Sequence, residues 1–103
     1  MKTEKFVKAF FEEKEDLLKY YTSVKTETEV GRLIKSLNLS GSQNIAMNKI
    51  INATLTDAYY TILLGLDGSA SIGGIQEMYD LKSEDGSQIS EEIEGYAYEY
   101  FHE

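Results

Sequence analysis

The segment SQNIAMNKIINATLTDAYYTILLGL, residues 42–66, is the longest stretch of this chain with one helical pattern. Its apolar residues recur at helical spacing along one broad side: Ile45, Met47, Ile50, Ile51, Ala58, Tyr59, Ile62 and Leu63. Leu55, Leu64 and Leu66 add apolar positions on other sides, so the pattern predicts a central helix that other elements surround. Gly65 and the Asp-Gly-Ser of residues 67–69 supply its C-terminal stop.

Two further helices are predicted before this segment. Residues 3–22 place six apolar side chains at intervals of three, four and seven, which is typical of an amphipathic helix: Phe6, Val7, Phe10, Leu17, Leu18 and Tyr21. Thr26 followed by Glu29 has the spacing of a capping box. The stripe behind it comprises Val30, Leu33, Ile34 and Leu37, and residues 38–41 then end this second helix.

The pattern changes after Gly73 and Gly74. Ile75, Tyr79 and Leu81 alternate with more polar residues, which indicates a β-strand. The Asp-Gly of residues 85–86 is a strong signal for a hairpin turn, and residues 87–89 supply a short return strand.

The C-terminal tail fits two structures. Ile93, Tyr96, Ala97, Tyr100 and Phe101 have helical spacing, with Ser90 as the N-cap and glutamates near the positive helix end. The alternating tyrosines at 96, 98 and 100 also fit a strand, and the pattern favours the helix. The expected fold is α+β: three N-terminal helices, a β-hairpin and a C-terminal helix in a single domain, residues 1–103.

The charge of the chain is strongly uneven. The 103 residues include 18 Asp and Glu against 10 Lys and Arg, a net charge of −8. Residues 1–51 hold nine cations and seven anions, a net of +2, whereas residues 52–103 hold one cation and eleven anions, a net of −10. Such a field repels nucleic acid and anionic membranes and attracts basic partners, so we expect no nucleic-acid or membrane partner.

The residue types that are absent or rare exclude several classes of chemistry. The chain has no Cys, which excludes disulfides, thiolate metal sites and cysteine nucleophiles. Its one histidine, His102, cannot by itself build a metal site or a catalytic triad. The most apolar run, residues 58–66, is far shorter than the ~20 residues needed to span a bilayer. We therefore expect a cytoplasmic protein that is not an enzyme and needs no cofactor or metal.

The loop DGSASIGG, residues 67–74, is the most distinctive connection. It follows a helix and precedes a strand, the reverse of a phosphate-binding loop, and it lacks the P-loop lysine. The favoured interpretation is a tight connection whose small residues pack close to the core. The alternative is a small-molecule-binding or regulatory domain that uses this loop, with Asp67, Ser69 and Ser71 as its candidate residues.

Tyrosines and carboxylates gather in the last third of the chain. We expect Tyr96 and Tyr100 to lie inside, with Tyr98 and Glu99 outside. Tyr is a frequent anchor of protein interfaces, and carboxylates speed association with basic partners. The candidate partner-binding residues are Tyr79, Glu84, Asp85, Glu91, Glu92, Tyr98 and Glu99.

Two of these segments carry a resemblance to a known group of proteins. YYTILLGLDGSASIG, residues 59–73, followed by EGYAYEYFH, residues 94–102, is similar to small cytoplasmic immunity proteins of bacterial toxin systems, including contact-dependent growth inhibition. The resemblance covers roughly the last 45 residues and implies a stoichiometric inhibitor of a cognate toxin domain, often a nuclease. No catalytic or ligand residues are implied by it. A nuclease cleft is basic because it holds phosphate, and an acidic, Tyr-bearing surface is complementary to such a cleft.

Overall fold

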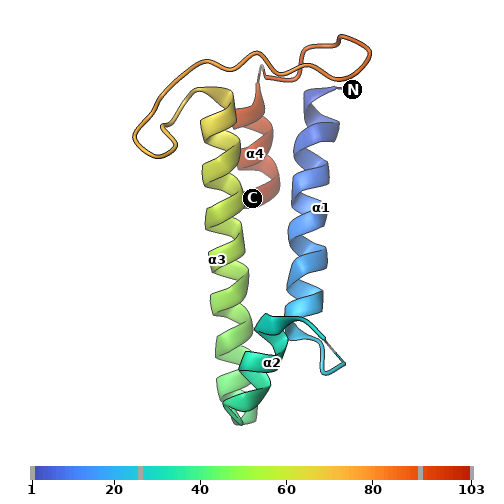
Figure 1. Cartoon of the computed structure of the whole chain (residues 1–103), viewed down its shortest axis with the longest axis vertical. Coiled ribbons are helices and arrows are strands. Elements are labelled where there is room, and N and C mark those ends of the chain that lie inside the picture. The colour runs from blue at the N-terminus through green and yellow to red at the C-terminus, as the bar shows by residue number, and fades with distance from the viewer. Residues whose placement is uncertain (1, 26, 91, 103) are drawn as a thin grey trace.

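The computed structural model describes residues 2–25, 27–90 and 92–102, and the described residues form four helices (Figure 1). These helices are α1 (Thr3–Thr22), α2 (Glu29–Ser36), α3 (Gly41–Asp67) and α4 (Ile93–His102). The long helices α1 and α3 run antiparallel side by side. None of the described helices combines the length and the apolar character needed to cross a membrane.

The central helix α3 has well-defined signals at both ends. The Ser40 hydroxyl accepts the N–H of Gln43 at 3.3 Å, and the Gln43 side chain accepts the N–H of Ser40 at 2.9 Å. This reciprocal pair is a capping box. At the other end Gly68 has a φ of 85°, the left-handed conformation that lets a helix stop. The predicted helix 42–66 is therefore confirmed, with one more residue at each end.

The core is small and lies where α1, α3 and α4 meet. Val7, Leu63, Ile93 and Ala97 are fully buried there, with Phe101 beside them. The ring of Phe101 packs edge-on against Phe11 and parallel to Tyr59. Aromatic side chains from three helices therefore hold α4 against the half of the α1–α3 pair that contains the start of α1 and the end of α3.

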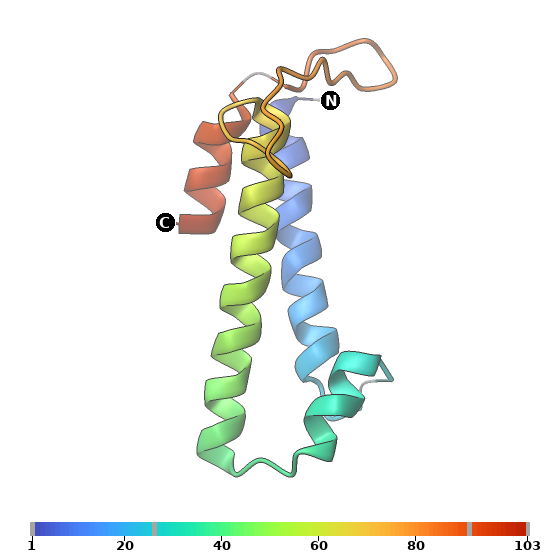
Figure 2. The same ribbon diagram turned by 60° about the vertical axis from the view of Figure 1, so that its left-hand side comes forward.

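The short helix α2 packs on α1 at the opposite end of the molecule. Figure 2 shows α2 and α4 on opposite sides of the α1–α3 pair. The hydroxyl of Thr28 accepts the N–H of Gly31 at 3.0 Å, so Thr28 is the N-cap of α2. The predicted helix is confirmed, while the cap expected at Thr26 lies outside the described residues.

The α+β prediction is wrong, because the described residues contain no strand and the fold is all-α. Only isolated bridges join Ile72 to Ile75 and Lys82 to Gln88. The turn expected at residues 85–86 does form, with Gly86 at a φ of 89°. The strand fails because every residue from 71 to 80 is exposed, Ile75 and Tyr79 included, so neither face of that segment is buried. A two-stranded hairpin without a buried face is marginal in water.

The tail is a helix, as the favoured prediction had it. Tyr96 and Tyr100 are half-buried while Tyr98 and Glu99 are exposed, which confirms the predicted orientation. The expected N-cap is wrong, because α4 begins at Ile93, three residues beyond Ser90. The Ser90 hydroxyl instead accepts the N–H of Leu81 at 3.4 Å, which ties the long loop to the entrance of α4.

Candidate functional site

The acidic half of the sequence gathers at one end of the molecule. Figure 1 shows the loop after α3 crossing this end and leading into α4. We call this part, formed by the end of α3, residues 68–90 and α4, the acidic end. The charge asymmetry of the sequence therefore becomes an asymmetry in space, with the excess of carboxylates at the acidic end.

An open concavity of about 540 Å³ lies between the end of α3 and the start of α4. Its lining residues are Asp67, Glu92, Glu94, Gly95, Tyr96 and Glu99, four of them carboxylates. The ion pairs found among the described residues involve other side chains. In the described part of the chain no three carboxylates are placed to share a metal ion. The concavity therefore presents a diffuse negative field, which suits Lys or Arg side chains of a partner protein.

Glu92 occupies an unusual backbone position at this concavity. Its φ is 66°, a left-handed conformation that costs a non-glycine residue roughly 1–2 kcal/mol. The carbonyl of Glu92 accepts the N–H of Tyr96 at 3.4 Å and so opens α4. Local strain of this kind persists where the surroundings over-determine the conformation, and it often marks functional positions.

Tyr98 stands out from α4 beside the concavity, with 53% of its surface exposed. Its ring lies 5.7 Å from that of His102, which in turn packs edge-on against Tyr60 at 4.3 Å. Burial and the nearby Glu94 carboxylate raise the pKa of Tyr60 above its usual value of 10. Tyr98 is thus an exposed aromatic side chain held by a row of rings, the character of an interface anchor.

The loop across the acidic end exposes several apolar side chains. Ile75, Met78 and Tyr79 are all exposed, and Met78 reaches 77%. The loop is nevertheless anchored, because the side-chain amide of Gln76 donates to the carbonyl of Gly68 at 3.0 Å. Apolar side chains held on a fixed backbone beside carboxylates are the ingredients of a protein-binding surface.

Glu84 and Asp85 lie on a separate turn, beyond the N-terminus of α1. The Asp85 carboxylate accepts hydrogen bonds from the hydroxyls of Ser83 and Ser87, both at 2.6 Å, and from the N–H of Ser87 at 3.0 Å. These bonds, led by that from Ser83, hold the pKa of Asp85 well below its usual range. The neighbouring Ser87 and Gln88 line a second concavity, with Thr3 of α1 and its N-cap residue Lys2.

The predicted partner-binding residues therefore fall into groups rather than one continuous face. Glu92 and Glu99 share the concavity beside α4, and Tyr98 projects from the same helix. Tyr79 belongs to the crossing loop, and Glu84 with Asp85 forms the outer turn. Glu91 lies outside the described residues. Asp67 and Glu94 join the concavity although neither was predicted for partner binding, because only the packing of α4 against α3 brings them there.

The loop of the alternative site, residues 67–74, forms a tight turn. Ile72 and Ile75 exchange backbone hydrogen bonds of 2.9 and 3.0 Å around Gly73 and Gly74, both with positive φ, as in a type I′ turn. A Cβ on Gly65 would lie 2.1 Å from the Ile72 side chain, so the loop packs directly onto α3. The favoured interpretation of a tight connection is confirmed in this respect, although no sheet follows the loop.

The three loop residues have different surroundings. The Ser69 hydroxyl donates to the Leu64 carbonyl at 3.3 Å and Ser71 is exposed, while Asp67 alone lines the acidic concavity.

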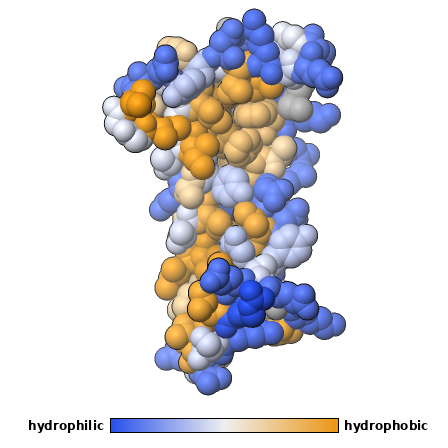
Figure 3. Space-filling view, viewed as in Figure 1, coloured by the Kyte–Doolittle hydropathy of each residue, from blue (hydrophilic) through white to orange (hydrophobic). Residues whose placement is uncertain are grey.

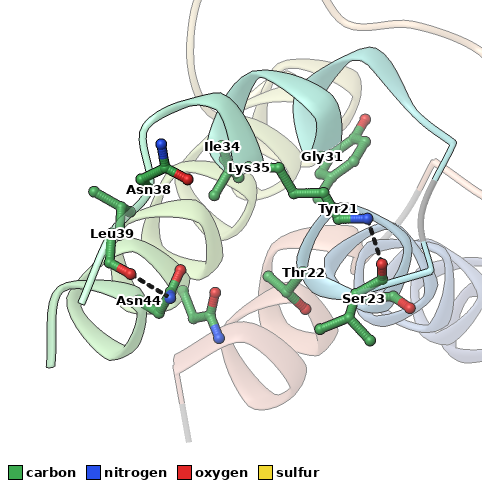
Figure 4. A pocket seen from close by; sticks show the side chains of 11 residues that line it. Tyr21, Thr22, Ser23, Gly31, Ile34, Lys35, Asn38, Leu39 and Asn44 are labelled. Atoms are coloured by element: carbon green, nitrogen blue, oxygen red, sulfur yellow. Dashed lines mark hydrogen bonds between the residues drawn. The ribbon is translucent and has the colours of Figure 1, made fainter. Parts of the chain in front are cut away.

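Sequence reasoning missed a cavity of about 430 Å³ at the opposite end, between α1, α2 and α3 (Figure 4). Asn38, Asn44 and Asn48 contribute amide groups to it, and Asn44 donates to the carbonyl of Leu39 at 3.3 Å. The ammonium of Lys35 donates to the carbonyl of Val24. The run of asparagines along one side of α3 was the available signal. These two hydrogen bonds are local, since each joins a helix to the loop that precedes it.

Comparisons of this chain with protein-family models, with curated proteins and with solved structures found no match.

Proposed function

We propose that this protein is an immunity protein that binds a basic bacterial toxin domain, a nuclease, through its acidic end. The observation that carries the proposal is the concavity beside α4, where four carboxylates surround one depression next to the exposed Tyr98. The resemblance of residues 59–73 and 94–102 to immunity proteins supports the same class. The proposed place of action is the cytoplasm.

Inhibition in this proposal is steric and electrostatic. A nuclease binds the phosphates of its substrate with basic side chains, and the carboxylates of Glu94 and Glu99 offer the same side chains a competing anion. Tyr98 anchors the contact with a large and nearly rigid side chain. The concavity is built on two packed helices, so little ordering entropy is lost on binding. Occupation of the cleft excludes nucleic acid, and the mechanism needs no covalent step or cofactor.

The first experiment is a binding measurement with the toxin domain encoded beside this chain. The Glu94→Lys, Glu99→Lys double variant changes the charge of the concavity by four units at exposed positions. We expect association to be at least about tenfold slower at low ionic strength, because steering depends on the local field. The control is the Asp16→Lys, Glu27→Lys double variant, which makes the same charge change away from the acidic end.

The two variants separate local steering from bulk charge. The proposal predicts normal association for the control and a slowed reaction for the concavity variant, with nuclease inhibition lost in parallel. Equal rates for the two variants would remove the assignment of the site. A lack of binding by the unmodified protein, even at low salt, would remove the function itself.

A further inference from the structure

The molecule exposes more surface than a monomer of its size should. Its accessible surface is 7053 Å², whereas a typical folded monomer of 11.7 kDa exposes about 5,900 Å². Its radius of gyration is 16.3 Å, against about 13 Å for a compact chain of this length. The excess, roughly 1,200 Å², exceeds the ~800 Å² that each partner buries in a standard protein interface.

Part of this excess is an apolar groove on the side of the α1–α3 pair that faces away from α4. The groove has a volume of about 360 Å³ and is lined by Phe6, Ala9, Phe10, Glu13 and Tyr59. The rings of Phe6 and Phe10 lie 5.0 Å apart, and Tyr59 closes the floor from α3 at 5.9 Å from Phe10. Figure 3 shows this side, with apolar surface running down between the two helices.

A second apolar feature lies on the same side at the other end. Val30 and Leu33 of α2 and its C-cap residue Leu37 have helical spacing, and all three are exposed, Leu33 by 60%. Gly31, on the opposite side of α2, is buried against the rest of the molecule. The apolar stripe of α2 therefore faces outward, and it lies on the side of the α1–α3 pair that carries the groove (Figures 1 and 2).

We propose that the groove is filled by α2 of a second copy of this chain in an antiparallel, two-fold dimer. In this dimer one copy is rotated by 180°, so that the long axes of the two copies point in opposite directions and their groove-bearing sides face each other. Each α2 stripe then lies opposite the groove of the other copy. The contact is isologous, since Leu33 meets Phe10 of the partner copy and Phe10 meets its Leu33. In each copy α2 covers one half of this side and the groove lies uncovered in the other half. In the dimer, α2 of each copy covers the groove of the other.

Charge supports this orientation. An antiparallel pair separates the two acidic ends along a molecule 48 Å long, several times the Debye length of about 8 Å at physiological ionic strength. A parallel pair would instead place two regions of the same negative sign together.

The mass of the full chain in solution tests the proposal. Sedimentation equilibrium at about 100 μM should give twice the chain mass of 11.7 kDa. Leu33→Glu places a charge at the centre of the contact, and we expect it to raise the dimer dissociation constant at least about tenfold. Met78→Glu is the control, because Met78 is similarly exposed but belongs to the loop. It should remain dimeric.

Cross-linking tests the geometry independently, because the chain contains no Cys. Mixing the single variants Ala9→Cys and Leu33→Cys under oxidising conditions should give a disulfide-linked heterodimer. A mixture in which Met78→Cys replaces either variant should not give this disulfide-linked heterodimer. A monomer at 100 μM, a dimer unaffected by Leu33→Glu, or preferential linking through Met78→Cys would each overturn the proposal. So would a monomer whose groove binds lipid vesicles or a different protein.

Discussion

The glycines at residues 68 and 95 give a sharp prediction, because the same substitution should change stability in opposite directions at the two positions. Gly68 ends α3 with a φ of 85°, whereas Gly95 lies within α4, where a Cβ would meet no other atom within 4 Å. Alanine at residue 68 must adopt a left-handed conformation that costs an L-residue roughly 1–2 kcal/mol. Alanine at residue 95 instead restricts the unfolded chain and gains roughly 0.5–1 kcal/mol.

Sterics add to the cost at residue 68. A Cβ there would lie 2.3 Å from the sulfur of Met78 and 3.2 Å from the carbonyl oxygen of Glu77. The Met78 side chain is exposed and can move, but the Glu77 carbonyl belongs to the backbone that anchors the loop. We therefore expect the loss for Gly68→Ala to reach the upper part of the range, about 2 kcal/mol.

Thermal denaturation followed by circular dichroism at 222 nm measures both changes as shifts in melting temperature. At about 4–8 °C per kcal/mol for a domain of this size, Gly68→Ala should lower the melting temperature by roughly 8–16 °C. Gly95→Ala should raise it by roughly 2–8 °C. Gly41→Ala serves as a further control, because its Cβ also meets nothing within 4 Å and its φ is not positive. Equal losses for Gly68→Ala and Gly95→Ala would refute the role assigned to the left-handed conformation.

Three further outcomes are expected. Leu63→Ala removes a fully buried side chain from the centre of the small core and should cost about 2–5 kcal/mol in urea unfolding. The pKa values of Tyr59 and Tyr60 are raised, chiefly by burial, so ultraviolet titration should show them ionising above pH 10. Their contribution to stability is complete below pH 10 and is lost as the pH rises through the folded-state pKa. The pKa of Asp85 is lowered instead. An NMR titration should therefore show the chemical shift of its carboxyl carbon changing only at a pH well below the usual Asp range.

Sequence reasoning located the helices because each has a local signal. Ser40 with Gln43 and the glycine at 68 mark the ends of α3 within the sequence itself. The strand prediction failed at Ile75 and Tyr79 because alternation indicates a strand only when one face is buried. Ile75 and Tyr79 are exposed, and that exposure depends on where the loop lies relative to the bundle. No local signal reports it.

The candidate site was predictable in the same limited sense. The phase of α4 identified Tyr98 and Glu99 as outward-facing, and the structure agrees. The meeting of Asp67 with Glu94 required the packing of two helices joined by 25 residues, which the sequence does not encode locally. Lys14 shows the same limit. It stands between two glutamates in the sequence, yet it is only 5% exposed, with its ammonium 5.1 Å from the centre of the Phe11 ring.

The two proposed surfaces respond differently to salt, which makes them separable. The concavity beside α4 works through unpaired carboxylates, so raising the ionic strength should weaken partner binding. The dimer contact joins apolar side chains, and its antiparallel orientation keeps the acidic ends several Debye lengths apart, so its dissociation constant should change little with salt. The concavity lies beside α4, on the side away from the α2 stripe and the groove. The proposed dimer therefore leaves both concavities open, and it would bind two of the proposed partner molecules at once.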